Sequence, residues 1–126
     1  MRVVVDASAI GAIAFGEPHW RTLAAHIEGE TLLAPPLLDV ELTNIALKKL
    51  RKGPGTFEQV AVSLIAALSL PITRVAVPSA SVFALAAETG LTAYDASYLW
   101  LARSRDAELI TLDKALARLA NEESEP

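Results

Sequence analysis

The segment "RVVVDASAIGAIAF", residues 2–15, shows how the chain is built. Its first four residues are dominated by β-branched valines, which is typical of a strand buried in a parallel sheet. The strand ends at Asp6, and the apolar residues after it predict a short helix that Gly16 and Pro18 stop. The chain therefore begins with a strand that leads through an acid into a helix.

The same alternation of strands and helices continues to the end of the chain. Further strands are expected at residues 31–34, 72–77 and 108–112, and helices at about 20–28, 36–52, 56–70, 79–88, 94–105 and 114–120. This alternation requires crossover connections, so we predict a three-layer α/β/α sandwich around a mostly parallel sheet of four to five strands. With no long linker, residues 1–126 are expected to form a single domain, with residues 121–126 as a frayed tail.

The composition excludes several classes of protein. The sequence has no cysteine, so it has no disulfide, thiolate metal site or cysteine nucleophile. Its net charge of −4 argues mildly against a protein that holds nucleic acid mainly by neutralising phosphates. Asp6 interrupts the first apolar run, so the N-terminus does not resemble a signal peptide, and no apolar run could span a bilayer. We therefore expect a cytoplasmic protein that does not associate with membranes.

Three acids have a simple structural explanation when each is taken alone. Asp6 and Asp113 follow predicted strands and precede predicted helices, so each could cap a helix. Thr92 and Asp95 fit a capping box at the start of another helix. However, ligands of parallel α/β folds bind at the carboxyl ends of the strands, where Asp6 and Asp113 are expected to be neighbours.

Glu41 is not explained by capping. At about 100° per residue it lies at the edge of the helical arc that Leu38 and Ile45 define, so it is expected to point inward. Asp95 similarly shares a helix face with Tyr98. Carboxylates gathered in one place repel one another, and a hard divalent cation such as Mg²⁺ would relieve that repulsion. His19 and His26 show no ligand spacing with a third partner, so zinc is not expected.

Four segments together resemble a known family. "VVVDASAI" (3–10), "PPLLDVELTNIAL" (35–47), "LTAYDASYLWLA" (91–102) and "LITLDKAL" (109–116) resemble the PIN domain, and within it the VapC toxins of type II toxin–antitoxin pairs. The resemblance covers essentially the whole chain in the same order.

The resemblance implies a metal-dependent endoribonuclease that cleaves RNA and is inhibited by a cognate VapB-like antitoxin, in a protein that is typically a homodimer. It implies one or two Mg²⁺ or Mn²⁺ ions. The residues that match the family's acidic cluster are Asp6, Glu41, Asp95 and Asp113, with Ser8 and Thr111 in supporting positions. We expect Asp6 and Asp95 to be the principal ligands, and Glu41 to bind through water or to help deprotonate the nucleophile.

Two surface features remain open at this point. The basic run "KKLRK", residues 48–52, could contact RNA, or it could simply complement the dipole at the end of its helix. Phe15, Trp20 and Phe57 are candidates for antitoxin contacts, although filling the core of the domain is the simpler explanation for each residue taken alone.

Two other functions also fit a strand that ends in an acid. A phosphatase with an aspartyl nucleophile would want a second acid two residues after Asp6, where Ser8 stands, and a steadying cation for which Lys114 has no clear context. A receiver-like or scaffold domain could bind Mg²⁺ without turnover. Four acids from four separate elements are more than simple metal anchoring needs.

Overall fold

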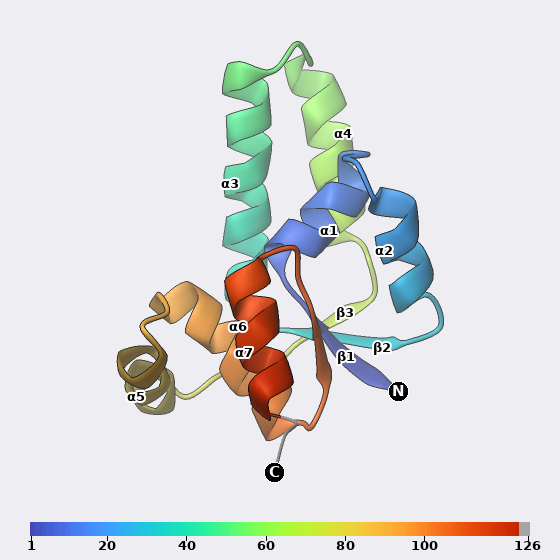
Figure 1. Ribbon diagram of the computed structural model, residues 1–126. Helices are drawn as coiled ribbons and strands as arrows, with labels where there is room; N and C mark the ends of the chain where they lie inside the picture. Colours follow the sequence, from blue (N-terminus) through green and yellow to red (C-terminus); the bar gives the residue numbers. More distant parts are fainter. Residues whose placement is uncertain (124–126) are drawn as a thin grey trace.

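A computed structural model describes residues 1–123 and contains one four-stranded sheet in which every pairing is parallel (Figure 1). The strands are β1 (Arg2–Val5), β2 (Thr31–Ala34), β3 (Ile72–Arg74) and β4 (Glu108–Ile110), in the order β3-β2-β1-β4. In the register, Val4 of β1 lies between Leu33 of β2 and Leu109 of β4. The predicted parallel sheet is therefore confirmed, with four strands among the described residues.

Helices cover both faces of this sheet. They are α1 (Ala7–Ala14), α2 (Trp20–Ile27), α3 (Leu37–Lys52), α4 (Phe57–Leu68), α5 (Ser79–Thr89), α6 (Ala93–Ser104) and α7 (Lys114–Glu123). Helices α2, α3 and α4 pack against α1, whereas α5 and α7 pack against α6, which contacts β1 and β4. This is the expected three-layer α/β/α arrangement. None of the helices within residues 1–123 combines the length and the hydrophobicity that a membrane span needs.

The strand order indicates at which edge of the sheet a ligand would bind. From β1 the chain adds β2 and then β3 on one side, and it later returns to add β4 on the other side of β1. The order of the strands thus reverses at β1, and in open α/β sheets ligands bind at such a switch point, outside the carboxyl ends of the strands. Asp6 directly follows β1, and Thr111 directly follows β4.

Strand β1 is one of the two inner strands of the sheet, and its burial agrees with that position. Its three valines are buried because helices cover both faces of the sheet, as the continuous apolar run predicted. Beyond β1, the core contains Ile10 of α1, Leu42 of α3 and Leu99 of α6.

Two strands are shorter than the sequence predicted, and one helix is longer. Strand β3 ends at Arg74 rather than at residue 77; the last bond of this ladder runs from the Val75 amide to the Ala34 carbonyl, and α5 starts at Ser79. Strand β4 ends at Ile110 because the next residue leaves the ladder to contact Asp6. Helix α7 extends to Glu123, beyond the expected end at residue 120. The rest of the predicted tail, residues 124–126, lies outside the described residues.

Helices α3 and α4 form an antiparallel hairpin that rises from the carboxyl edge of the sheet (Figure 1). The hairpin turns at a complete capping box, in which the Thr56 hydroxyl accepts from the Gln59 amide and the Gln59 side chain accepts from the Thr56 amide. At the other end, α3 starts directly after β2 and Pro36. The N-terminal part of α3, which carries Glu41, is therefore fixed at the edge where β1 and β4 also end.

Candidate active site

Asp6 is the most enclosed acid of the cluster. It is only 5% exposed and it caps α1, because its Oδ1 accepts a hydrogen bond of 3.0 Å from the amide of Ala9. The Ser8 hydroxyl donates to the same oxygen at 2.7 Å, and the Thr111 hydroxyl donates to Oδ2. The capping interpretation is thus correct, but the cap also holds the carboxylate rigidly at the carboxyl end of β1.

The loop after β4 is fixed to α1 by the same group of atoms. The Leu112 amide donates to the Ser8 hydroxyl at 3.0 Å, and the Asp113 amide donates to the Thr111 hydroxyl at 3.0 Å. Ser8 and Thr111, the two supporting residues expected from the sequence, therefore bridge β1 and β4 through Asp6. Their hydroxyls orient the carboxylate of Asp6.

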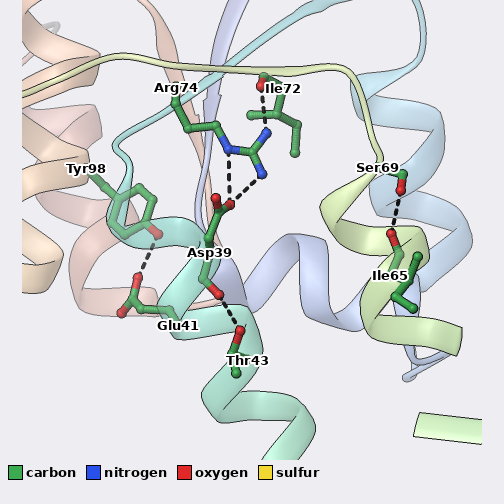
Figure 2. Close-up of polar contacts among 8 residues, drawn as sticks. All are labelled: Asp39, Glu41, Thr43, Ile65, Ser69, Ile72, Arg74 and Tyr98. Atoms are coloured by element: carbon green, nitrogen blue, oxygen red, sulfur yellow. Dashed lines mark hydrogen bonds and ion pairs between the residues drawn. The ribbon is translucent and has the colours of Figure 1, made fainter. Parts of the chain in front are cut away.

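Glu41 points inward, as its place on the helix predicted. Its side chain is half-buried, and its Oε1 accepts a hydrogen bond of 2.6 Å from the hydroxyl of Tyr98 on α6 (Figure 2). Next to it, Arg74 of β3 pairs with Asp39 at 2.5 Å and also donates to the Ile72 carbonyl at 2.7 Å. Strand β3 and helix α6 thus fix the N-terminal part of α3, and α6 does so through Glu41 itself.

Asp95 is held by its backbone alone. Thr92 caps α6 by accepting from the Asp95 amide at 3.2 Å, which is one half of the expected capping box. Within residues 1–123, no group donates a hydrogen bond to the half-buried Asp95 carboxylate, so the reciprocal half is missing. Capping explains Thr92, but it does not explain the carboxylate of Asp95.

Asp113 lies at the exposed edge of the cluster. Its Oδ1 accepts from the Leu116 amide at 2.9 Å and its carbonyl accepts from the Ala117 amide, so it caps α7 as proposed from the sequence. The four acids thus come from four separate places in the fold: the end of β1, the N-terminal part of α3, the first turn of α6, and the cap of α7 after β4.

One cleft of about 620 Å³ brings the four acids together. Its walls contain all four carboxylates and Ser8, and they also include Val40, Thr43, Asn44, Ile45, Leu47, Lys48, Tyr94 and Tyr98. Thr111 joins the group through its bond to Asp6. Of the basic run at residues 48–52, only Lys48 lines this cleft. Of the proposed antitoxin contacts, Phe57 is 70% exposed, Trp20 is partly exposed and Phe15 is half-buried.

The electrostatics of the cleft disfavour four free carboxylates. Burial raises the pKa of Asp6, and the charge of Asp113 raises it further against the lowering effect of its hydrogen bonds. Burial likewise raises the pKa of Glu41 and of Asp95, with added repulsion from neighbouring acids. Within residues 1–123 no lysine or arginine forms an ion pair with any of these four acids. Among the described residues, the negative charge of the four acids is therefore not neutralised by an ion pair.

The donor chemistry of the cleft suits a hard divalent cation. Carboxylate and hydroxyl oxygens are the ligands that Mg²⁺ and Mn²⁺ prefer, and among the described residues no histidine lines the cleft to favour zinc. In the described part of the chain, however, no three acidic or histidine side chains are close enough together to form a ready-made metal site. The residue types thus fit such a cation, and the side chains would have to draw closer to hold one.

Tyr98 is the site residue that sequence reasoning missed. The sequence showed it only as a neighbour of Asp95 on the buried face of a helix. In the structure it is 1% exposed, and burial together with the bond to Glu41 raises its pKa well above the ordinary value, so the phenol stays protonated and donates. The available signal was that a buried tyrosine hydroxyl requires a partner, and Glu41 was the inward-facing acid without one.

Fold and cleft together define a class of small parallel α/β proteins that present several carboxylates at the switch point of the sheet. Comparison with known proteins identifies the family within this class, because a family model of the PIN domain matches residues 3–122. The chain is 32% identical to Ribonuclease VapC3 of Pyrobaculum aerophilum, over 93% of both chains. It also matches the crystal structure of PAE2754 from Pyrobaculum aerophilum, with a TM-score of 0.72, 30% identity and 98% of each chain covered.

The chain belongs to the PIN domain family, and it is VapC-like within that family. The resemblance seen in the four sequence segments is thereby confirmed.

Proposed function

We propose that this protein is a metal-dependent endoribonuclease that acts in the cytoplasm as the toxin of a toxin–antitoxin pair. The observation that carries the proposal is the convergence of Asp6, Glu41, Asp95 and Asp113 on one cleft, with no lysine or arginine paired to them in residues 1–123. The similarity to Ribonuclease VapC3 supports RNA as the substrate. Folding does not require these four carboxylates to face one another, so we propose that they are gathered there to bind a ligand.

Asp6 and Asp95 are the proposed principal ligands of Mg²⁺ or Mn²⁺, with Asp113 completing the acidic cluster. A bound divalent cation would neutralise charge on a phosphodiester and lower the pKa of a water molecule. Ser8 and Thr111 keep the Asp6 carboxylate in one orientation, which reduces the reorganisation needed to bind. The Asp95 carboxylate has all its lone pairs available to a ligand within the described residues.

Glu41 is the proposed proton acceptor for the attacking water. Its Oε1 is engaged by Tyr98, which leaves Oε2 to accept a proton in the cleft. Burial raises the pKa of Glu41, and a carboxylate with a raised pKa is a stronger base. The tyrosine keeps this base turned toward the other acids, because it fixes one oxygen at 2.6 Å.

The decisive test uses a circular single-stranded RNA, which only an endonuclease can linearise. We expect the purified protein to linearise it with Mn²⁺ or Mg²⁺ and to be inactive in EDTA. Asp95→Asn serves as the matched control, because the Asp95 side chain makes no hydrogen bond in residues 1–123 that the change could disrupt. Cleavage that persists in EDTA or in this variant would contradict the metal-dependent mechanism. No cleavage together with no Mn²⁺ binding would contradict the enzyme altogether.

The proposed toxin role and its partners have separate tests. The role predicts that expression arrests growth and that Asp95→Asn relieves the arrest. The proposed antitoxin and homodimer would need apolar surface, and Phe57, Val62 and Ile65 on α4 are exposed. Light scattering of the purified protein measures the homodimer directly, and a monomeric mass would exclude it.

A further inference from the structure

Helix α3 carries a polar stripe that continues the cleft away from the acids. Asn44 and Lys48 follow Glu41 at three and seven residues, so all three lie on the same side of the helix. Both side chains are exposed and both line the cleft. A second hollow of about 340 Å³ shares Ile45 and Lys48 with the first. The cleft therefore extends as a groove along α3.

The basic residues of this helix differ in their freedom to bind a ligand. Lys49 forms an ion pair of 2.9 Å with Glu17, and its ammonium group lies 5.6 Å from the centre of the Phe15 ring. Arg51 is exposed but lines neither hollow. Lys48 lines both hollows, and its side chain has no partner in residues 1–123. Lys52 is also exposed and lines the second hollow, but it does not line the cleft with the acids. Lys48 is thus the cation of this run that reaches the acidic cleft itself.

On the opposite wall, the cleft presents an aromatic ring next to an acid. Tyr94 is in the first turn of α6, directly before Asp95, and it is 62% exposed while lining the cleft. Val40, also largely exposed, lines the same cleft from α3. Neither the core nor a hydrogen bond within residues 1–123 accounts for the exposed ring. An exposed aromatic face in a polar cleft is suited to stacking on a flat ligand.

We infer that Tyr94 and Lys48 form a binding site for an unpaired stretch of RNA, with a base stacked on Tyr94 and a backbone phosphate on Lys48. The inference rests on the proposed function and specifies its substrate class. The base faces of a duplex are covered by their neighbours, so only single-stranded nucleic acid offers both a base face and a phosphate to this groove. Asn44, between Glu41 and Lys48, is placed to hydrogen-bond to the same strand.

The test measures binding rather than cleavage, so its outcome is separate from that of the nuclease assay. All proteins carry Asp95→Asn, and a fluorescent 12-nucleotide RNA of mixed sequence is titrated in millimolar Mn²⁺, alone and annealed to its complement. We expect the single strand to bind more tightly than the duplex. Tyr94→Ala should weaken single-strand binding by about five-fold or more, and Tyr94→Phe should retain it, because the ring stacks and the hydroxyl is not needed.

Matched variants keep the test specific. Phe83→Ala removes an aromatic ring that is 75% exposed on α5 and outside the cleft, and it should leave binding unchanged. Lys48→Ala should reduce the slope of log Kd against log salt by about 0.7, the value for one phosphate contact on a single strand. Arg51→Ala makes the same charge change on the same helix and should not alter that slope.

Three results would overturn the inference: equal losses in Tyr94→Ala and Phe83→Ala, equal slopes in Lys48→Ala and Arg51→Ala, or tighter binding of the duplex. Any of them could occur with the nuclease intact, in which case the proposed function stands and only this site is wrong. Conversely, the binding pattern could be as expected while the protein without Asp95→Asn cleaves no RNA. That result would keep the binding site and overturn the nuclease.

Discussion

The two sides of the cleft hold their acids in opposite ways. On the strand side, Asp6 accepts hydrogen bonds from the Ala9 amide and from two hydroxyl groups, and it caps a helix. On the helix side, Glu41 accepts one bond from Tyr98, and Asp95 accepts none from the described residues. The strand side is therefore tied to the fold, whereas the helix side is nearly independent of it. An acid without a structural task, placed beside three others, is best explained by what it binds.

The largest expected effect is a loss of RNA cleavage, and it should be similar for an acid on either side of the cleft. Asp6→Asn and Asp95→Asn each remove one negative charge from the proposed cation site while keeping the shape of the side chain. We expect each variant to lose at least about 100-fold in the rate of RNA cleavage, because the charge that a cation neutralises in the transition state contributes several kcal/mol. Single-turnover cleavage in Mn²⁺ measures this loss. A variant that keeps more than about a tenth of the wild-type rate would remove that acid from the site.

The stability of asparagine and alanine variants should differ between the two sides of the cleft. At position 6, asparagine keeps an oxygen to accept from Ala9, whereas alanine leaves the amide without its cap. We expect Asp6→Ala to be less stable than Asp6→Asn by about 1–2 kcal/mol, the usual cost of losing an N-cap together with a buried acceptor. At position 95 the order should reverse, because no hydrogen bond is lost and alanine favours the helix over asparagine.

Urea unfolding of the four variants in EDTA measures both differences. EDTA removes any contribution of a bound cation, so only interactions within the chain are compared. The stability difference between the asparagine and alanine variants could also be the same at positions 6 and 95. That result would show that Asp6 contributes no more to the stability of the fold than Asp95 does.

The fold was predictable because its signals are local. A parallel sandwich follows from the valine run of β1 and from the alternation of strands and helices along the chain. The ends of β3 and β4 were not predictable, because they depend on contacts between distant residues. Thr111 has a strand-forming side chain, but it leaves the ladder at β4 to donate to Asp6, 105 residues away.

The candidate site was predictable as a set of residue types but not as a network. Each of Asp6, Thr92 and Asp113 does cap a helix, and at Asp6 and Asp113 this structural role is compatible with the proposed functional one. The bond from Tyr98 to Glu41 joins helices 57 residues apart, and periodicity on one helix carries no information about the other. Likewise, the letters "KKLRK" do not reveal that Lys49 is paired and Lys48 is free to face the cleft.

A smaller effect is expected from the single bond on the helix side. Tyr98→Phe removes the donor to Glu41 and keeps the buried ring, so packing should be preserved. We expect cleavage at saturating RNA to fall about two- to ten-fold, which corresponds to the 0.5–1.5 kcal/mol of one hydrogen bond. The Mn²⁺ concentration that gives half-maximal cleavage should change as well, because Glu41 is then held less firmly.

The matched control for this variant is Ser97→Ala. Ser97 is the neighbouring buried residue on α6, and its hydroxyl donates to the Ala93 carbonyl at 2.8 Å rather than to an acid. Its loss should affect stability slightly and leave both the cleavage rate and the Mn²⁺ dependence unchanged. If both variants reduced cleavage equally, Tyr98 would support the helix and not Glu41.

The smallest expected effect is on the pH dependence of stability, and it belongs to the strand side. Burial raises the pKa of Asp6 in the folded protein, so without a cation the folded state holds this proton more tightly than the unfolded state does. The resulting stability is complete below the unfolded pKa, near 3.8, and is lost as the pH rises through the higher folded value. In EDTA, Asp6→Asn should therefore gain stability relative to wild type between about pH 4 and neutral pH. Urea midpoints across this range measure the difference in stability between the two proteins, which isolates Asp6 from the other carboxyl groups.

Mn²⁺ at neutral pH should reverse the order of stability of wild type and Asp6→Asn, because it stabilises only the protein that can bind it. A difference that does not change with pH would mean that the hydrogen bonds to Asp6 fully compensate its burial, and the strand side would then need no cation.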